Sequence, residues 1–559
     1  MSIARMPHGI TSAALPAAHR HAAVRDRGLI AVVVLAFALN VLGLGWGLPL
    51  SGIHGWDVDG IAPLGPLIAA KRMILDDWWN SGYYNKYPMG HFFVLMGGYA
   101  PYLGYLWLTG GLQKPSEVYP FGLADPQTVL TVLTVIARSV NVLMGVGIVL
   151  CVYLTARRFG DRRAALFSAL TIAFSPPFIF YAHTGNIDTP SLFWSALALL
   201  ALGRLVAGEC RLRHYLLGGA AVGMAAATKE QTLGLFLLLP LSVLVLHARH
   251  AGAARLTPWS VIRAAGERGP LAALGAAGGV FVLATHLVFN WHGNVLRFRW
   301  RLYGVHPIYG TEYPGGRREV DGAVEAFAEL AVHTLEAMNP VLFLAGVAGL
   351  LVLTLRRPWA RHFALPLLSY TAFAVALFPF FRARFVMQAV LVLAFFAGPV
   401  LASLWTLGVK RSRALAAAVL LIWGYSFVYG VEVNSLLVGD ARYAAEAWLE
   451  RSAAPTATVE AFSGPTYLPR FPRHMTVRQS AMTATELAGL DERSPDLIVL
   501  SSAFSLRFRE GTEAGELLAR LLRGDFGYRP VQTFRREPLV SPRLFAGLSP
   551  EIVILARHR

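Results

Sequence analysis

Residues 129–156 read VLTVLTVIARSVNVLMGVGIVLCVYLTA, and the only charged side chain in this run is Arg138. About 20 predominantly apolar residues in a helix suffice to span the hydrocarbon core of a bilayer. The run is therefore predicted to be a transmembrane helix. Eleven further long apolar runs lie near residues 28–50, 88–109, 163–182, 188–207, 214–228, 231–247, 270–291, 334–355, 362–380, 385–405 and 413–432. The chain is predicted to be a polytopic α-helical membrane protein.

The composition of the whole chain agrees with this interpretation. Of the 559 residues, 55% are hydrophobic and only 15% are charged, and the mean hydropathy is +0.50. An ordinary soluble domain carries about a quarter charged residues. The values argue against a disordered chain, a fibre and a soluble multidomain enzyme. The two cysteines, Cys151 and Cys210, lie in or beside apolar runs and imply no disulfide framework.

The formal net charge of +17 is better explained by membrane orientation than by nucleic-acid binding. Much of the positive excess lies in short connectors between apolar runs, and such connectors stay on the cytoplasmic side. The first run, residues 28–50, is too long for the core of a signal peptide. It is predicted to be an uncleaved first helix that follows a cytoplasmic N-terminal tail, residues 1–27.

Five basic connectors predict the number of crossings. They are Arg157-Arg158 with Arg162-Arg163, Arg211 with Arg213, the segment Arg249 to Arg268, Arg356-Arg357 with Arg361, and Lys410-Arg411 with Arg413. All five fall inside if the run at 88–109 does not cross, which favours eleven crossings. That run contains Gly97-Gly98 and Pro101, and it is predicted to be a re-entrant or juxtamembrane helix packed in the outer loop.

Eleven crossings from a cytoplasmic N-terminus place the C-terminus outside. The outer face then carries a first loop at 51–128, a second loop at about 292–333, and residues 433–559. In this last part, helices are expected at 441–450 and 513–522, and strands at 497–500 and 551–556, which is typical of a small soluble α/β domain. The predicted organisation is a membrane module at 28–432 followed by an extracytoplasmic domain at 433–559.

Acidic and basic side chains gather at the predicted outer ends of the helices. Asp57 and Asp59 follow the first helix directly, and Asp188 begins a later apolar run on the same predicted side. Ionisable groups among membrane helices are candidates for a functional site. Five cations also lie at the outer face against the positive-inside rule: Lys86, Arg138, Lys229, Arg382 and Arg384. Such a set suits a phosphate at that level, although snorkelling to lipid head groups is the ordinary explanation for any single one.

Two histidines flank the acids. His54 and His183 could line the same pocket, and with Asp57 and Asp59 they could bind a metal. The four residues have no tight ligand spacing, so no cofactor is expected and a divalent metal is not favoured. No Walker loop and no dinucleotide fingerprint is present, which argues against a nucleotide-linked substrate.

An ordered series of motifs connects the chain to a known family. The series is the acidic first loop, Lys86-Tyr87-Pro88, Arg138 with Asn141-Val142-Leu143-Met144-Gly145, Tyr153 with Arg157-Arg158-Phe159-Gly160, Asn186-Ile187-Asp188-Thr189-Pro190 and Thr228-Lys229-Glu230. It resembles the GT-C glycosyltransferases, in particular their protein O-mannosyltransferase and lipid A aminoarabinose transferase-like branch, over roughly residues 28–250. Arg382-Ala383-Arg384-Phe385 is similar to the late Arg-Tyr position of that family, with Phe in place of Tyr. Where many relatives have a Pro-Pro pair this chain has Lys-Tyr-Pro-Met, and where many have adjacent acids it has Asp-Val-Asp.

The resemblance implies a GT-C membrane enzyme that takes a sugar from a polyprenyl-phosphate donor on the extracytoplasmic face. The acceptor would be a hydroxyl of a protein, a lipid or a glycan. Independently of the resemblance, the high Ala and Arg content suggests a bacterium with a GC-rich genome and hence a bacterial inner membrane. A phosphate leaving group needs no general acid, so the reaction requires one carboxylate base and cations that hold the phosphate. Asp57 or Asp59 would be the base, with Asp188 as an orienting group. Lys86, Arg138, Lys229 and Arg384 would hold the carrier phosphate.

A single base in a direct displacement implies inversion at the anomeric carbon. The main alternative is a membrane transporter or lipid flippase with a polar site at its outer face. Secondary transporters place their sites near the bilayer midplane and often contain internal repeats. In this chain the acids cluster at one predicted face and no repeat is visible.

Overall fold

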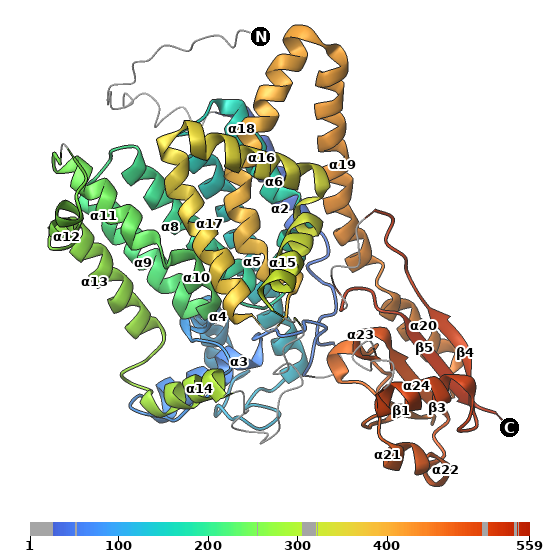
Figure 1. The fold of residues 1–559 in the computed structure, drawn as a ribbon. Coiled ribbons are helices and arrows are strands. Elements are labelled where there is room, and N and C mark those ends of the chain that lie inside the picture. Colours follow the sequence, from blue (N-terminus) through green and yellow to red (C-terminus); the bar gives the residue numbers. More distant parts are fainter. Residues whose placement is uncertain are drawn as a thin grey trace.

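The computed structural model describes residues 26–50, 53–253, 255–303, 320, 322–378, 380–454, 456–505, 512–540, 545 and 547–558. Most of the predicted N-terminal tail and residues 304–319 of the second outer loop lie outside these ranges. The described part is a bundle of helices followed by a small domain with a β-sheet (Figure 1). The small domain lies beside the end of the bundle where α3, α4 and α14 are found.

The bundle contains helices α2 to α19. Their bounds are α2 Arg27–Val41, α3 Leu64–Ala70, α4 Gly90–Leu108, α5 Pro126–Ala156, α6 Arg162–Ala173, α7 Pro176–Ala182, α8 Asp188–Val206, α9 Leu212–Thr228, α10 Leu233–Phe236, α11 Leu239–His250, α12 Pro258–Ala265, α13 Arg268–Ala284, α14 Trp291–Tyr303, α15 Ala323–Met338, α16 Pro340–Arg356, α17 Pro358–Leu377, α18 Met387–Arg411 and α19 Arg413–Val438. Short π or 3-10 turns form η1 Lys71–Asp76, η2 Glu230–Thr232 and η3 Ala383–Phe385.

Side-chain caps fix where several of these helices begin. Asp26 accepts hydrogen bonds from two backbone N–H groups at the start of α2, and Asp161 accepts one at the start of α6. Asp125 caps α5, and Pro126 follows it at the first helical position. Each cap satisfies a backbone donor that has no partner inside the helix. In this way polar residues at the ends of apolar runs define the helix boundaries.

The structure supports a multi-pass membrane protein. In the described part of the chain, six helical segments are long and apolar enough to cross a bilayer, or up to eight if each of two bent helix pairs is one span. The bent pairs are α6 with α7, at 61°, and α15 with α16, at 116°. Two shorter apolar helices are α2 and α13. The polytopic class is thus confirmed, whereas the eleven crossings and the position of the 88–109 segment, which forms α4, stay predictions.

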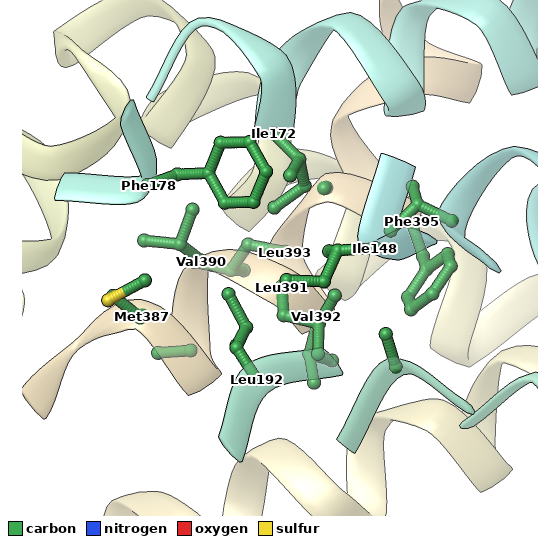
Figure 2. Close-up of a cluster of buried hydrophobic side chains, with 14 of the residues drawn as sticks. Ile148, Ile172, Phe178, Leu192, Met387, Val390, Leu391, Val392, Leu393 and Phe395 are labelled. Atoms are coloured by element: carbon green, nitrogen blue, oxygen red, sulfur yellow. The ribbon is translucent and has the colours of Figure 1, made fainter. Parts of the chain in front are cut away.

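Part of the bundle core is formed where side chains of α18 meet side chains of α5, α6, α7 and α8. Figure 2 shows side chains from these helices meeting in one apolar cluster, and they include Ile148, Ile172, Phe178, Leu192 and Leu391. Close backbone approach occurs elsewhere in the bundle, between α9 and α13. A Cβ atom added at Gly219 would lie 2.1 Å from the Ala273 carbonyl oxygen. Small residues of this kind allow membrane helices to approach closely and pack by van der Waals contact, which is one of the forces that drive helix association in lipid.

The C-terminal part forms a mixed five-stranded sheet with helices. Its elements are α20 Ala441–Ser452, β1 Thr458–Ala461, η4 Pro465–Tyr467, β2 Thr476–Gln479, α21 Ala484–Ala488, α22 Leu490–Arg493, β3 Leu497–Ser501, α23 Ser502–Ser505, α24 Glu513–Arg523, β4 Tyr528–Phe534 and β5 Ile552–Arg557. The strand order is β2-β1-β3-β5-β4. Strands β1, β2 and β3 run parallel, and β5 pairs antiparallel with both β3 and β4.

The sequence predicted four of these elements, α20, β3, α24 and β5, and the structure confirms each of them. It did not predict β1, β2 and β4. Strand β2 has four residues and no buried side chain, and β4 contains Pro530 and is largely exposed, so neither produces an apolar run. These strands form only because β1 and β5 offer them backbone partners.

Candidate functional site

The candidate site lies at the end of the bundle nearest the C-terminal domain. Residues 42–50 and 53–61, called the first loop from here on, follow α2 at this end, and they carry Asp57 and Asp59. The start of α5 is tied to the same loop, because the side chains of Gln127 and Thr131 both donate to the Pro49 carbonyl oxygen. The site is thus assembled from a loop and from the ends of several helices.

Asp57 is held firmly between α5 and the turn before α8. Its side chain is only 7% exposed. The Arg138 Nη2 atom donates to Asp57 Oδ1 at 2.8 Å, and the Gly185 backbone N–H donates to Asp57 Oδ2 at 2.8 Å. The Arg138 Nε atom lies 3.4 Å from the same Oδ2. Both oxygens of Asp57 therefore have fixed donors.

Arg138 is completely buried within α5, and its charge is balanced inside the protein. Besides the contact with Asp57, its Nη1 atom donates to the carbonyl oxygens of Leu44 at 2.6 Å and Trp46 at 2.5 Å. The guanidinium group thus binds a carboxylate with one edge and the backbone of the first loop with the other. Its planar array of donors suits this double contact.

Asp59 forms a second cluster with two cations. The Lys86 Nζ atom lies 3.2 Å from Asp59 Oδ1, and the Arg384 Nη1 atom lies 2.6 Å from Asp59 Oδ2. Burial works to raise the pKa of Asp59, but the charges of Arg384 and Lys86 outweigh it and hold the pKa below its usual range. Asp59, Lys86 and Arg384 each keep 18% to 28% of the side chain exposed, so this cluster is more accessible than the Asp57–Arg138 pair.

Asp188 and Lys229 form a third ion pair. Asp188 is the first residue of α8, and Lys229 follows the last residue of α9. The Lys229 Nζ atom lies 2.5 Å from Asp188 Oδ1, and the two side chains are 12% and 3% exposed, respectively. The Lys229 Nζ atom and the Arg384 guanidinium group each lie 5.1 Å from the centre of the Phe385 ring, which links this pair to the Asp59 cluster.

Three tyrosines complete the surroundings of these clusters, and sequence reasoning did not select them as site residues. Tyr87 and Tyr181 are close enough to interact electrostatically with Asp59, Asp188 and Arg384. The Tyr370 hydroxyl donates to the Phe385 carbonyl oxygen. Tyr87 lies within the Lys-Tyr-Pro motif, which is a usable signal. The other two lie in apolar runs, where nothing in the sequence distinguishes them from ordinary packing residues.

His54, His183 and Arg382 form no ion pair in the three clusters, although His183 is close enough to Arg138 and Asp57 to interact with them electrostatically. His183 is buried, and its ring nitrogens contact the carbonyl oxygens of Ile179 and Leu42 at 2.7 and 2.6 Å. His54 is exposed in the first loop. Arg382 is also exposed, and it contacts the ring of Phe380. Their assignment to the site stays a prediction.

Chemically, the arrangement offers carboxylates to accept a proton and cations to bind an anion. Three carboxylates and four cations lie in the three clusters, so positive charge exceeds negative charge by one. Over the part of the chain that the structure describes, no group of three or more His, Cys, Asp or Glu side chains could hold a metal ion.

Comparison with known proteins defines the class. Residues 128–265 match the family model described as dolichyl-phosphate-mannose-protein mannosyltransferase. The matched segment extends from α5 to the end of α12, and it contains Arg138, Asp188 and Lys229. The class that this segment matches is thus that of membrane glycosyltransferases. The resemblance expected from the motifs is confirmed for this segment.

Several solved structures resemble the chain at low sequence identity. ArnT from Cupriavidus metallidurans bound to undecaprenyl phosphate is 15% identical, with coverage of 96% of this chain and 98% of that chain and a TM-score of 0.44. The Archaeoglobus fulgidus oligosaccharyltransferase tethered with an acceptor peptide is 13% identical, with coverage of 90% and 72% and a TM-score of 0.46. The S. cerevisiae protein O-mannosyltransferase Pmt1-Pmt2 complex bound to the sugar donor is 17% identical, with coverage of 49% and 36% and a TM-score of 0.34. A search of curated protein sequences found no match.

Proposed function

We propose that this chain transfers a sugar from a polyprenyl-phosphate donor to an acceptor hydroxyl at the end of the bundle that holds the three clusters. The observation that carries the proposal is that acids and cations from distant segments meet there. Asp59 and Arg384 are separated by 325 residues in sequence, and Asp57 and Arg138 by 81. The donor class follows from the family description, which names a dolichyl-phosphate sugar.

Lys86, Lys229 and Arg384 are the groups proposed to hold the carrier phosphate. All three side chains are partly exposed, whereas the Arg138 side chain is completely buried. Charge-assisted hydrogen bonds to phosphate are short and strong, and they stabilise the negative charge that develops as the sugar leaves. In the structure these cations pair with Asp59 and Asp188, so a bound phosphate would share them with those acids.

Asp57 is the proposed base, and Arg138 is proposed to position it. The complete burial of Arg138 and its contacts with two loop carbonyls fit a positioning role better than direct contact with the carrier. Asp59 would then assist by organising Lys86 and Arg384. One base acting in a single displacement would invert the configuration at the anomeric carbon.

The test supplies the purified protein in lipid vesicles with radiolabelled polyprenyl-phosphate sugars and a set of protein, lipid and glycan acceptors. We expect label to move from one of the donors to an acceptor hydroxyl. The Asp57→Asn protein, prepared in the same way, is the control for transfer by contaminating enzymes. Transport of the labelled carrier across the vesicle membrane without transfer of the sugar would contradict the proposal and favour a transporter.

The orientation is the first prediction. Eleven crossings would place the three clusters and the C-terminal domain on the extracytoplasmic face, and all five basic connectors inside. Reporter fusions after Leu436 and after Arg163 should therefore give extracytoplasmic and cytoplasmic signals, respectively. A cytoplasmic signal at Leu436 would overturn this orientation.

The second prediction concerns the carrier phosphate. Arg384→Gln should raise the KM for the donor by about 10-fold to 100-fold, because it removes a charged hydrogen bond to phosphate. Arg384→Lys should recover only part of the loss, since lysine keeps the charge but not the planar fork. Arg382→Gln, two residues away at an exposed position, should have a smaller effect. An unchanged KM for Arg384→Gln would remove this residue from the phosphate site.

A further inference from the structure

The C-terminal domain contains a fully buried ion pair at its junction with the membrane module. Asp440 and Arg442 are both 0% exposed, and they lie at the start of α20. The Arg442 Nη2 atom donates to Asp440 Oδ2 at 2.8 Å, and its Nε atom donates to Asp440 Oδ1 at 3.0 Å. Arg442 also donates to the carbonyl oxygens of Thr466 and Gly547. The pair is therefore anchored to two other segments of its own domain.

The same pair contacts two tryptophans of the first loop. The Trp46 Nε1–H donates to Asp440 Oδ2 at 2.9 Å. The Arg442 guanidinium carbon lies 4.0 Å from the centre of the Trp56 ring and 5.4 Å from that of Trp46. Both indoles are at most 2% exposed. A cation held against aromatic rings away from water attracts them strongly, so these contacts tie the loop to the domain.

The loop is bound from its other side by Arg138, which holds Asp57. Arg138 donates to the Trp46 carbonyl oxygen, and Trp56 immediately precedes Asp57. Direct contacts thus run from Asp440 through Trp46 and Arg138 to Asp57. The loop thus lies between two arginines: Arg442 contacts its indole rings, and Arg138 binds its backbone carbonyls and the Asp57 carboxylate.

The packing of Gly47 leaves this loop little room to shift. Gly47 has a φ of +53°, and a Cβ atom there would lie 2.5 Å from the Trp56 ring. The Trp56 N–H donates to the Gly47 carbonyl oxygen at 2.9 Å, and the Gly47 N–H donates to the Tyr443 hydroxyl of α20 at 3.1 Å. The two ends of the loop are therefore packed on each other and on the C-terminal domain.

We infer that Asp440 and Arg442 are positioning residues, through which the C-terminal domain holds Asp57 in its reactive geometry. The inference rests on the proposed function, because it takes Asp57 as the base. Buried ion pairs add little to stability compared with apolar packing, whereas they can specify one arrangement among several. Here the arrangement that the pair specifies is the path of the loop next to Asp57.

The domain offers a matched control in a second ion pair. Arg493 binds Glu460 with two hydrogen bonds, of 3.0 and 2.5 Å, and Glu460 is 2% exposed. This pair links α22 to β1, and Arg493 also donates to the carbonyl oxygen of Glu486 within the same domain. Arg493→Gln therefore breaks an ion pair inside the C-terminal domain. The contacts of that domain with the first loop are made by other residues, among them Asp440 and Arg442.

The experiment compares Arg442→Gln, Trp46→Phe and Arg493→Gln with the wild-type full chain in lipid nanodiscs. A displacement of about 1 Å at a reacting group can cost about 100-fold in rate, so we expect Arg442→Gln to lower kcat by about 10-fold to 100-fold. The KM for the donor should not change, because the phosphate-binding cations lie on other segments. Trp46→Phe keeps an aromatic ring and removes the hydrogen bond from the indole N–H to Asp440. Like Arg442→Gln, it should lower kcat. Arg493→Gln should keep the wild-type kcat.

Amide hydrogen exchange of peptides covering residues 44–50 and 55–60 gives a readout that does not depend on turnover. Exchange should rise in Arg442→Gln and Trp46→Phe and stay at the wild-type level in Arg493→Gln. If Arg442→Gln fails to fold, Trp46→Phe decides the question. Equal kcat and equal exchange in the Trp46 and Arg493 variants would overturn the inference. Absence of transfer by the wild type would refute the proposed function instead, and the exchange data would still show whether the domain holds the loop.

Discussion

Asp57→Asn should lower kcat for sugar transfer by about 10²-fold to 10⁴-fold, which is the usual cost of losing a general base. Asparagine keeps the size of the side chain and can still accept a hydrogen bond from Arg138, but it cannot take a proton from the acceptor. The measurement is turnover by purified protein at saturating donor, so that the loss is seen in kcat. Thermal stability must be followed in parallel, because Asp57 also neutralises the buried charge of Arg138.

Asp59→Asn is the matched control for this prediction. It lies two residues away and carries the same group, but it pairs with Lys86 and Arg384 instead. We expect its main effect on the KM for the donor, because those cations would lose their organising acid. Near-normal turnover in Asp57→Asn together with an inactive Asp59→Asn would make Asp59 the base. Full activity in both variants would remove the first loop from the mechanism.

Arg138→Met should reduce the free energy of unfolding by about 3–5 kcal/mol, because it leaves Asp57 as a buried charge without its partner. Asp57 is 7% exposed and would keep only the Gly185 N–H among the donors described above. The measurement is thermal or denaturant unfolding of the protein in detergent. Arg384→Met should cost less, because both Arg384 and its partner Asp59 are partly exposed and water can solvate the remaining carboxylate.

The double variant Asp57→Asn with Arg138→Met separates loss of the ion pair from loss of packing. It removes both charges, so it should recover a substantial part of the stability that Arg138→Met loses. Transfer should stay low in the double variant, since the base is still absent. If the double variant is as unstable as Arg138→Met, the loss comes from the contacts of Arg138 with Leu44 and Trp46 rather than from the buried charge.

The membrane class and most of the candidate residues could be predicted from the sequence for one reason. Charged side chains are costly among apolar segments, so the few that occur there stand out. Asp188 and Arg138 were selected on that basis, and both lie in the segment that matches the glycosyltransferase family. The helices and strands α20, β3, α24 and β5 were predictable as well, because their apolar residues recur with the period of a helix or form a short buried run.

The pairing of the charges was decided only by the tertiary structure. Nothing in the sequence indicates that Arg138 binds Asp57 while Arg384 binds Asp59, because those partners lie 81 and 325 residues apart and meet only when the helices pack. The 116° bend between α15 and α16 was also decided only by the tertiary structure. It divides one apolar run that the sequence predicts to be a single helix.

The contribution of the C-terminal domain was also hidden from the sequence. Asp440 and Arg442 look like ordinary polar residues at the start of a helix, and Trp46 looks like one more apolar residue at the end of a membrane segment. Local sequence determines which groups are apolar, charged or able to cap a helix, since those properties belong to single residues and their near neighbours. Which charge neutralises which, and which domain holds the loop beside Asp57, depends on contacts between distant segments, and the folded chain alone brings those segments together.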